Sequence, residues 1–107
     1  MKQFIIDNIT ILLGESAKEN WSLFASSSPS YIWVHLESFP SGHVIIQSSN
    51  PSDKIIKEAS EICKNHTKYR NLKNIKVNYT LCSNLKKGDI EGEVIIKSWK
   101  KCNTIKV

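Results

Sequence analysis

Two histidines are the residues whose type and spacing could support acid–base chemistry. His35 lies in the alternating segment 31–37, and His43 begins the segment 43–47; we expect these segments to form neighbouring antiparallel strands. Two imidazoles that titrate near neutral pH could exchange protons with a ribose hydroxyl and a leaving oxygen, as in metal-independent RNA cleavage. His43 could instead stack on a base or donate to a phosphate, His35 could contact the ligand, and Gly42 would let the backbone approach closely. A structural hydrogen bond is the alternative for His35.

Neither a metal site nor a cofactor site is expected. Cys63, Cys82 and Cys102 are far apart and never form a C-x-x-C pair, and the histidines lack the spacing of a zinc finger. Gly14 is isolated rather than part of a phosphate-binding glycine loop, and the acidic residues are too scattered to hold magnesium. We therefore expect no catalytic residue and no cofactor, and a protein that is not an enzyme.

Positive charge is concentrated in the second half of the chain. The whole chain carries 15 basic and 10 acidic residues, a net charge of +5. Residues 1–53 contain two lysines and five acidic residues, a net charge of −3, whereas residues 54–107 contain thirteen basic and five acidic residues, a net charge of +8. This asymmetry is typical of nucleic-acid binding. A solvated face, or a surface that docks an acidic protein partner, gives the same pattern.

The candidate phosphate contacts lie at the end of a helix expected at about 53–69 and in a loop expected at 83–89. They are Lys64, Lys68, Arg70, Lys86 and Lys87. A helix end and a loop tip can converge on one ridge, where about four to six phosphate contacts would give a log–log salt slope near −4 to −5. The helix dipole is another reason for cations at a helix end. Asn84 could read a base edge or cap its own loop.

The elements that must position these residues indicate one α+β domain, residues 1–107. The patterns predict a largely antiparallel mixed sheet of about six to seven strands, with two helices free to pack on one face. The expected elements are a hairpin at 3–13, a helix at about 16–25, strands at 31–37 and 43–47, the main helix, a strand at 75–81, and a final hairpin of 93–99 and 104–107. No apolar run approaches the ~18 residues of a membrane helix, so we expect a soluble cytoplasmic or nuclear protein without membrane insertion.

Several short motifs occur in the order found in a known family. They are Gly14 with Lys18, Glu19 and Asn20; Ile32, Trp33 and His35; Pro40, Ser41, Gly42 and His43; Glu58, Ala59 and Tyr69; Val77 to Thr80; Ser83 to Lys87; and Gly92 to Val94. On these motifs, residues 10–107 resemble the NFACT-R domain, an RNA-binding module. In that family the domain usually belongs to a multidomain protein that joins the large ribosomal subunit during rescue of stalled chains and recruits tRNA.

The resemblance implies an RNA-binding module for tRNA or ribosomal RNA, linked to ribosome-associated quality control, with DNA as an alternative nucleic acid and the ribosome as a further partner. Two other classes of function stay open on the residues alone. One is a protein-interaction module whose basic surface docks an acidic partner. The other is a ribonuclease in which His35 and His43 act as acid and base.

Overall fold

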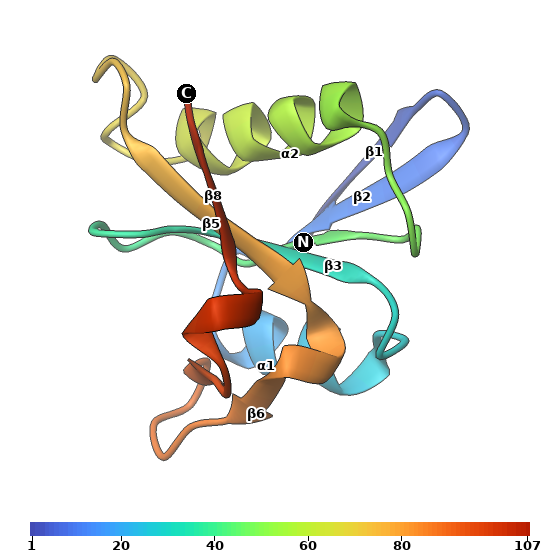
Figure 1. Cartoon of the computed structure of the whole chain (residues 1–107). Helices are drawn as coiled ribbons and strands as arrows, with labels where there is room; N and C mark the ends of the chain where they lie inside the picture. The colour runs from blue at the N-terminus through green and yellow to red at the C-terminus, as the bar shows by residue number, and fades with distance from the viewer.

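The chain folds around a twisted antiparallel sheet with a helix on each face (Figure 1). The computed structural model describes residues 1–107. Six strands form the main sheet in the order β1-β2-β4-β3-β5-β8, and β6 and β7 form a separate two-stranded sheet. The elements are β1 (Lys2–Ile6), β2 (Ile9–Leu13), α1 (Ala17–Ser26), β3 (Ile32–Leu36), β4 (Val44–Ile46), α2 (Asp53–Asn65), β5 (Lys76–Leu81), η1 (Cys82–Asn84), β6 (Leu85–Lys87), β7 (Val94–Ile96), η2 (Trp99–Lys101) and β8 (Asn103–Lys106). The expected α+β class is confirmed, and neither helix is long and apolar enough to cross a membrane.

The first two strands form the hairpin that the sequence predicts. Asp7 and Asn8 occupy its two-residue turn with φ angles of 51° and 65°. This left-handed region is one that short polar side chains tolerate, and it matches the twist of the flanking strands. β2 then pairs with β4 in a register that sets Leu13 opposite Val44, so Gly14 and His43 meet just beyond the paired residues.

One face of the sheet packs against α2. β3 and β4 alternate, so that Ile32, Val34 and Leu36 of β3 lie in the cluster that α2 covers. α2 adds residues three and four positions apart, the spacing of one helix face: Ile55, Ile56, Ala59 and Cys63. Burial raises the pKa of the Cys63 thiol to about 11, which makes it a packing residue rather than a nucleophile.

The opposite face of the sheet packs against α1 and the β6–β7 hairpin, below the sheet in Figure 1. Trp33 and Ile45 point to this side and meet Leu23 of α1 and Leu85 of β6. The prediction that both helices pack on one face was therefore wrong. β3 and β4 are apolar on both faces, and a sheet of that kind needs cover on each side.

The end of the chain does not form the predicted hairpin. β7 pairs with β6, whereas β8 pairs with β5 at the edge of the main sheet. Residues 83–89, predicted as a loop, contain part of η1 and all of β6. The η2 turn separates β7 from β8 and sends them to different sheets, so the predicted strand at 93–99 ends at Ile96.

α2 ends at Asn65, short of the predicted residue 69. The backbone N–H and the hydroxyl of Thr67 both donate to the Lys64 carbonyl, at 3.1 and 2.7 Å. The His66 Nδ1 donates to the Ile62 carbonyl at 2.8 Å. Local side-chain hydrogen bonds of this kind satisfy the last carbonyls and compete with further helix. Lys68 and Arg70 therefore lie in the loop after the helix.

Candidate nucleic-acid interface

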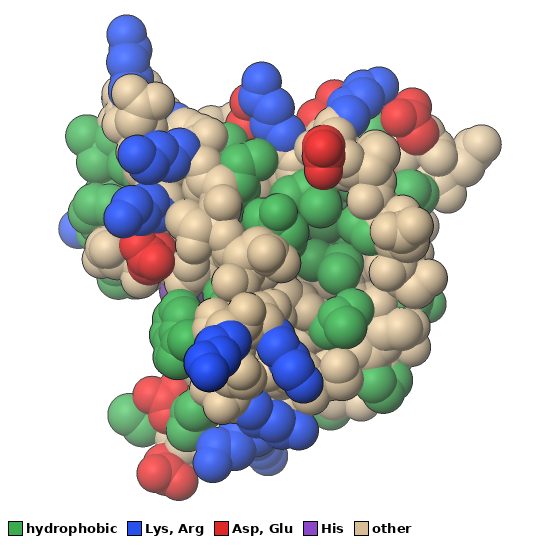
Figure 2. All heavy atoms as spheres, in the orientation of Figure 1, with side chains coloured by type: hydrophobic (Ala, Val, Ile, Leu, Met, Phe, Trp, Pro, Cys, Tyr) green, Lys and Arg blue, Asp and Glu red, His purple; other side chains and the backbone are tan.

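Exposed lysines gather around the β6–β7 hairpin and the turn that follows it. Two lie on β6, one directly follows β7 and two lie on η2: Lys86, Lys87, Lys97, Lys100 and Lys101. Figure 2 shows basic side chains grouped over β6 and η2 on the lower part of the molecule. Pairing of β6 with β7, and hydrogen bonds between η1 and the segment before η2, hold these elements together. Lys86 and Lys87 are consecutive on β6, so they point to opposite faces of the hairpin. We call these five residues the β6–η2 lysine cluster.

The positive charge of the second half is almost free of ion pairs. Four salt bridges occur in the structure, and three of them involve the N-terminal amine or Lys2. The fourth joins Lys54 to Asp7 at 3.3 Å, so it is the only one that uses a basic residue after position 53. No carboxylate therefore forms a salt bridge with the β6–η2 lysine cluster, although Asp89, Glu91 and Glu93 lie in the loop between β6 and β7.

Lys87 is held more firmly than the other members of the cluster. Its ammonium lies 3.9 Å from the centroid of the Trp21 ring, a cation–π contact. The Trp21 indole N–H donates to the Glu93 carbonyl at 2.8 Å, so this half-buried ring anchors α1 against the β6–β7 hairpin. Trp21 is therefore a packing residue, and Lys87 contributes to that packing as well as to the surface charge.

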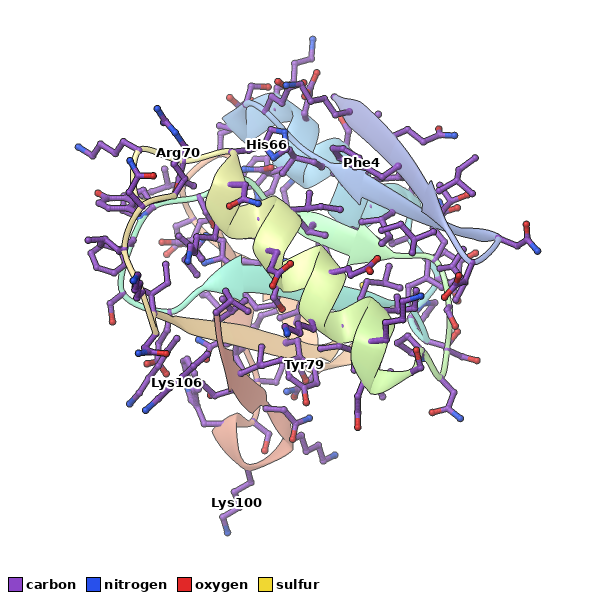
Figure 3. All side chains as sticks on the ribbon, turned by 90° about the horizontal axis from the view of Figure 1, so that it is seen from above. Phe4, His66, Arg70, Tyr79, Lys100 and Lys106 are labelled. Atoms are coloured by element: carbon purple, nitrogen blue, oxygen red, sulfur yellow. The ribbon has the colours of Figure 1, made fainter.

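The cations after α2 do not join this cluster. Lys64, Lys68 and Arg70 lie at the end of α2 and in the following loop, at the upper left of Figure 1, whereas β6 lies at the bottom. Figure 3 shows Arg70 at the upper left and Lys100 at the bottom, well separated in that view. α2 and β6 pack on opposite faces of the sheet, so the sheet separates the two basic areas. The single ridge expected from the sequence is absent.

Asn84 is buried and fully occupied by the protein. Its Nδ2 donates to the Thr80 hydroxyl at 3.1 Å and to the Ser98 carbonyl at 2.8 Å. Its Oδ1 accepts from the Ser98 N–H at 3.0 Å. Of the two roles considered for Asn84, this geometry corresponds to capping: the side chain ties η1 to the segment that precedes η2.

Asn84→Ala is expected to lower the free energy of unfolding by about 2–3 kcal/mol, because it leaves buried partners at Thr80 and Ser98 unsatisfied. Urea unfolding of the purified domain measures the change. Ser83→Ala, at the exposed neighbouring position, is the control and should have little effect. Equal losses in the two variants would show that the Asn84 hydrogen bonds do not stabilise the fold.

A tight backbone corner joins β2, α1 and β4. The Gly14 N–H donates to the His43 carbonyl at 2.9 Å, and the His43 N–H donates to the Asn20 Oδ1 at 3.1 Å. A Cβ at Gly42 would overlap the Gly14 carbonyl oxygen and lie 3.0 Å from the Leu13 Cδ1. The close approach that Gly42 allows in this structure is therefore to Gly14 of the same chain.

Trp33, His35 and His43 form an aromatic cluster beside this corner. Trp33 and His35 stack with centroids 5.4 Å apart, and the His43 ring is nearly perpendicular to both. The His35 Nδ1 donates to the Leu36 carbonyl at 2.6 Å. Burial lowers the pKa of His35, and burial together with the nearby His35 lowers the pKa of His43 to about 3. Both imidazoles are therefore neutral at pH 7.

The cluster lines a recess of about 360 Å³ between the sheet and the loop before β7. Its walls include His35 and His43 on one side and Glu91 and Glu93 on the other. Trp33 Nε1 and His43 Nδ1 are buried here without a hydrogen-bond partner, and their rings meet edge to face. Neutral imidazoles and two carboxylates can accept hydrogen bonds, and the carboxylates repel a phosphate. The recess therefore suits a ligand that donates hydrogen bonds better than it suits phosphate.

Sequence reasoning missed part of this interface. Lys97, Trp99, Lys100 and Lys101 were assigned to a strand or left without a role. In the structure Trp99–Lys101 form η2, and Lys97 lies between β7 and that turn. The signal that could have found them is an aromatic residue with lysines on both sides between positions 97 and 101. The prediction of a strand at 93–99 drew attention away from this pattern, because it assigned Lys97 and Trp99 to strand pairing instead of an exposed turn.

Comparisons with known proteins identify the family. The profile described as the NFACT protein RNA binding domain matches residues 3–98. The Rqc2 homolog RqcH of Bacillus subtilis (strain 168) is 32% identical over 80 residues, 74% of this chain and 14% of that protein. The C-terminal structure of the fibronectin/fibrinogen-binding protein from Streptococcus suis matches with a TM-score of 0.87 at 23% identity, over 98% of this chain and 43% of that chain, and so shares the fold. The chain thus spans less than half the length of either relative, and it belongs to the NFACT RNA-binding domain family.

Proposed function

We propose that this domain binds RNA through the β6–η2 lysine cluster. The observation that carries the proposal is the set of five exposed lysines on the linked elements β6, β7 and η2 with no salt bridge to any carboxylate. Lysines of this kind bind phosphate oxygens and release condensed counterions. Membership of the NFACT RNA-binding domain family supports RNA as the polyanion. His35, His43, Gly42 and Asn84 are not among the proposed phosphate contacts, because their groups are neutral or already engaged.

The RNA is proposed to be tRNA or ribosomal RNA, in a role linked to ribosome-associated quality control. Similarity to the Rqc2 homolog RqcH supports this link. Because the chain spans 14% of RqcH, we propose that it supplies RNA contacts rather than the whole activity of that protein. We propose the cytoplasm as the location for such a role, because ribosomes act there, with the nucleus as the alternative.

We also propose that the domain is not an enzyme. A general acid at neutral pH must carry a proton to give, and the low pKa of His43, about 3, leaves this imidazole neutral there. Labelled tRNA incubated with the domain should therefore remain intact. Cleavage that His43→Ala abolishes would establish the ribonuclease alternative instead.

Removal of two cluster lysines, Lys100→Ala with Lys101→Ala, is expected to weaken tRNA binding by roughly 10- to 60-fold at 0.1 M salt. The log–log salt slope should become less negative by about 2, since each phosphate contact contributes about 0.9. Fluorescence polarisation with labelled tRNA, measured between 50 and 200 mM salt, gives both quantities. Trp99 lies beside these lysines and stays unchanged in this variant.

The matched control is Lys54→Ala with Lys57→Ala, which removes the same charge from the exposed face of α2. It should change affinity much less, and so should Lys68→Ala with Arg70→Ala in the loop after α2. Equal weakening by all three pairs would mean that net charge, not the cluster, determines binding. No salt-dependent binding by the wild-type domain would contradict the proposed function.

The same unpaired lysines would also attract an acidic protein, the second candidate function. Capture of the domain from cell extract with and without ribonuclease separates the two. RNA binding predicts that captured partners are lost after ribonuclease treatment. Partners that survive it, and that the Lys100→Ala, Lys101→Ala variant loses, would favour protein docking.

A further inference from the structure

Trp99 stands out among the tryptophans because its side chain faces solvent. It is 62% exposed, whereas Trp33 is 4% exposed and Trp21 is half-buried under Lys87. A large aromatic ring contributes most to stability when it is buried, so this exposure does not serve the core. Trp99 also lies just outside residues 3–98, the segment matched by the family profile.

The turn that carries Trp99 is fixed to the body of the domain. Within η2 the Cys102 N–H donates to the Trp99 carbonyl at 3.2 Å. Before the turn, Asn84 exchanges hydrogen bonds with both backbone groups of Ser98. After the ring, the Thr80 hydroxyl donates to the Lys101 carbonyl at 3.0 Å. The backbone on both sides of the ring is therefore anchored, and an exposed ring on an anchored backbone loses little freedom when it binds.

Unpaired cations flank the ring along the chain. Lys100 and Lys101 follow it directly, and Lys97 precedes it while its Nζ donates to the Ser83 carbonyl at 3.2 Å. Glu37 is the carboxylate whose charge acts on this segment. Burial raises the pKa of the Cys102 thiol, and the negative charge of Glu37 raises it further. Glu37 nevertheless forms no salt bridge with any lysine. An aromatic ring between cations matches the alternation of base and phosphate along a single strand.

We propose that Trp99 is a stacking platform for an unpaired RNA base, with Lys100 and Lys101 on the flanking phosphates. The inference rests on the proposed RNA binding and deepens it, because it selects RNA that offers a single-stranded segment beside its duplex. Every base has a π-face, so the platform tolerates any sequence. A protein-docking patch would need contiguous apolar surface, whereas this ring is bordered by lysines in the sequence.

The test uses two RNA hairpins, one with a blunt end and one with a short adenosine overhang. Wild-type domain should bind the overhang hairpin more tightly, and its tryptophan fluorescence should be quenched on binding. Trp99→Ala should weaken binding of the overhang hairpin by about 5- to 100-fold, leave the blunt hairpin nearly unchanged, and keep the salt slope. Trp99→Phe should restore most of the loss, because phenylalanine still offers a ring.

The matched control is Ile5→Ala, which removes another side chain with 64% exposure, from β1 at the far edge of the sheet. It should bind both hairpins like the wild type. Equal wild-type affinity for the two hairpins, or equal weakening of both by Trp99→Ala, would overturn the platform while RNA binding stands. Binding of neither hairpin would overturn the proposed function and the platform with it. Ribonuclease-resistant protein capture that Trp99→Ala abolishes would reassign the ring to protein docking.

Discussion

Alanine at Gly42 is expected to lower the free energy of unfolding by about 3 kcal/mol or more. The added Cβ would overlap the Gly14 carbonyl oxygen and press on Leu13. Because a backbone atom is in the way, relief requires Gly14 and His43 to move apart at the end of the β2–β4 pair. Overpacking of this kind costs about 1–3 kcal/mol, and loss of the hydrogen bond from Gly14 to His43 adds about 1 kcal/mol.

Gly88→Ala is the matched control, because its added Cβ also overlaps a neighbour. That neighbour is the exposed side chain of Glu93, which can rotate away. Urea unfolding at pH 7 should therefore show a large loss for Gly42→Ala and a small one for Gly88→Ala. Similar losses of unfolding free energy in the two variants would mean that the backbone at Gly14 moves aside as easily as the Glu93 side chain rotates.

Local patterns were sufficient to predict several elements. The hairpin at 3–13 and the two helices were predicted as elements, and each depends on residues a few positions apart: the Asp7-Asn8 turn, the capping box at Ser16 and the apolar stripe of α2. In the structure Ser16 accepts from the Glu19 N–H at 3.1 Å, as that pattern requires. Such elements follow from hydrogen bonds and periodicity within one segment, so the sequence is enough to place them.

Long-range arrangement was harder to predict, and the candidate site depends on it. β6 and η2 are separate in sequence and are linked because β6 pairs with β7 and Asn84 binds Ser98. The expected ridge failed because no local pattern says which face of the sheet α2 covers. Lys68 was placed on a helix that ends earlier, at the hydrogen bonds made by Thr67. Packing across the sheet, rather than residue type, decides which cations share a surface.

Acidification from pH 7 to pH 5 is expected to lower the free energy of unfolding by about 2 kcal/mol through His43 alone. In the unfolded chain a histidine titrates near pH 6.5, whereas burial and His35 lower the pKa of His43 to about 3 in the folded domain. Between these values the unfolded chain binds more protons, so falling pH favours unfolding. The stability linked to neutral His43 is fully present above pH 6.5 and is lost progressively as the pH falls. By pH 3 the total loss is on the order of 5 kcal/mol.

Urea unfolding at pH 7 and pH 5 measures this loss, and His43→Phe isolates its source. Phenylalanine keeps an aromatic ring against Trp33 but cannot bind a proton, so about 2 kcal/mol of the pH dependence should disappear. Trp33→Phe changes the packing of the same cluster without removing a titratable group, and it should keep the wild-type pH dependence. Burial also lowers the pKa of His35, so a smaller dependence of the same sign should remain in His43→Phe. Unchanged pH dependence in His43→Phe would show that His43 does not link protonation to folding.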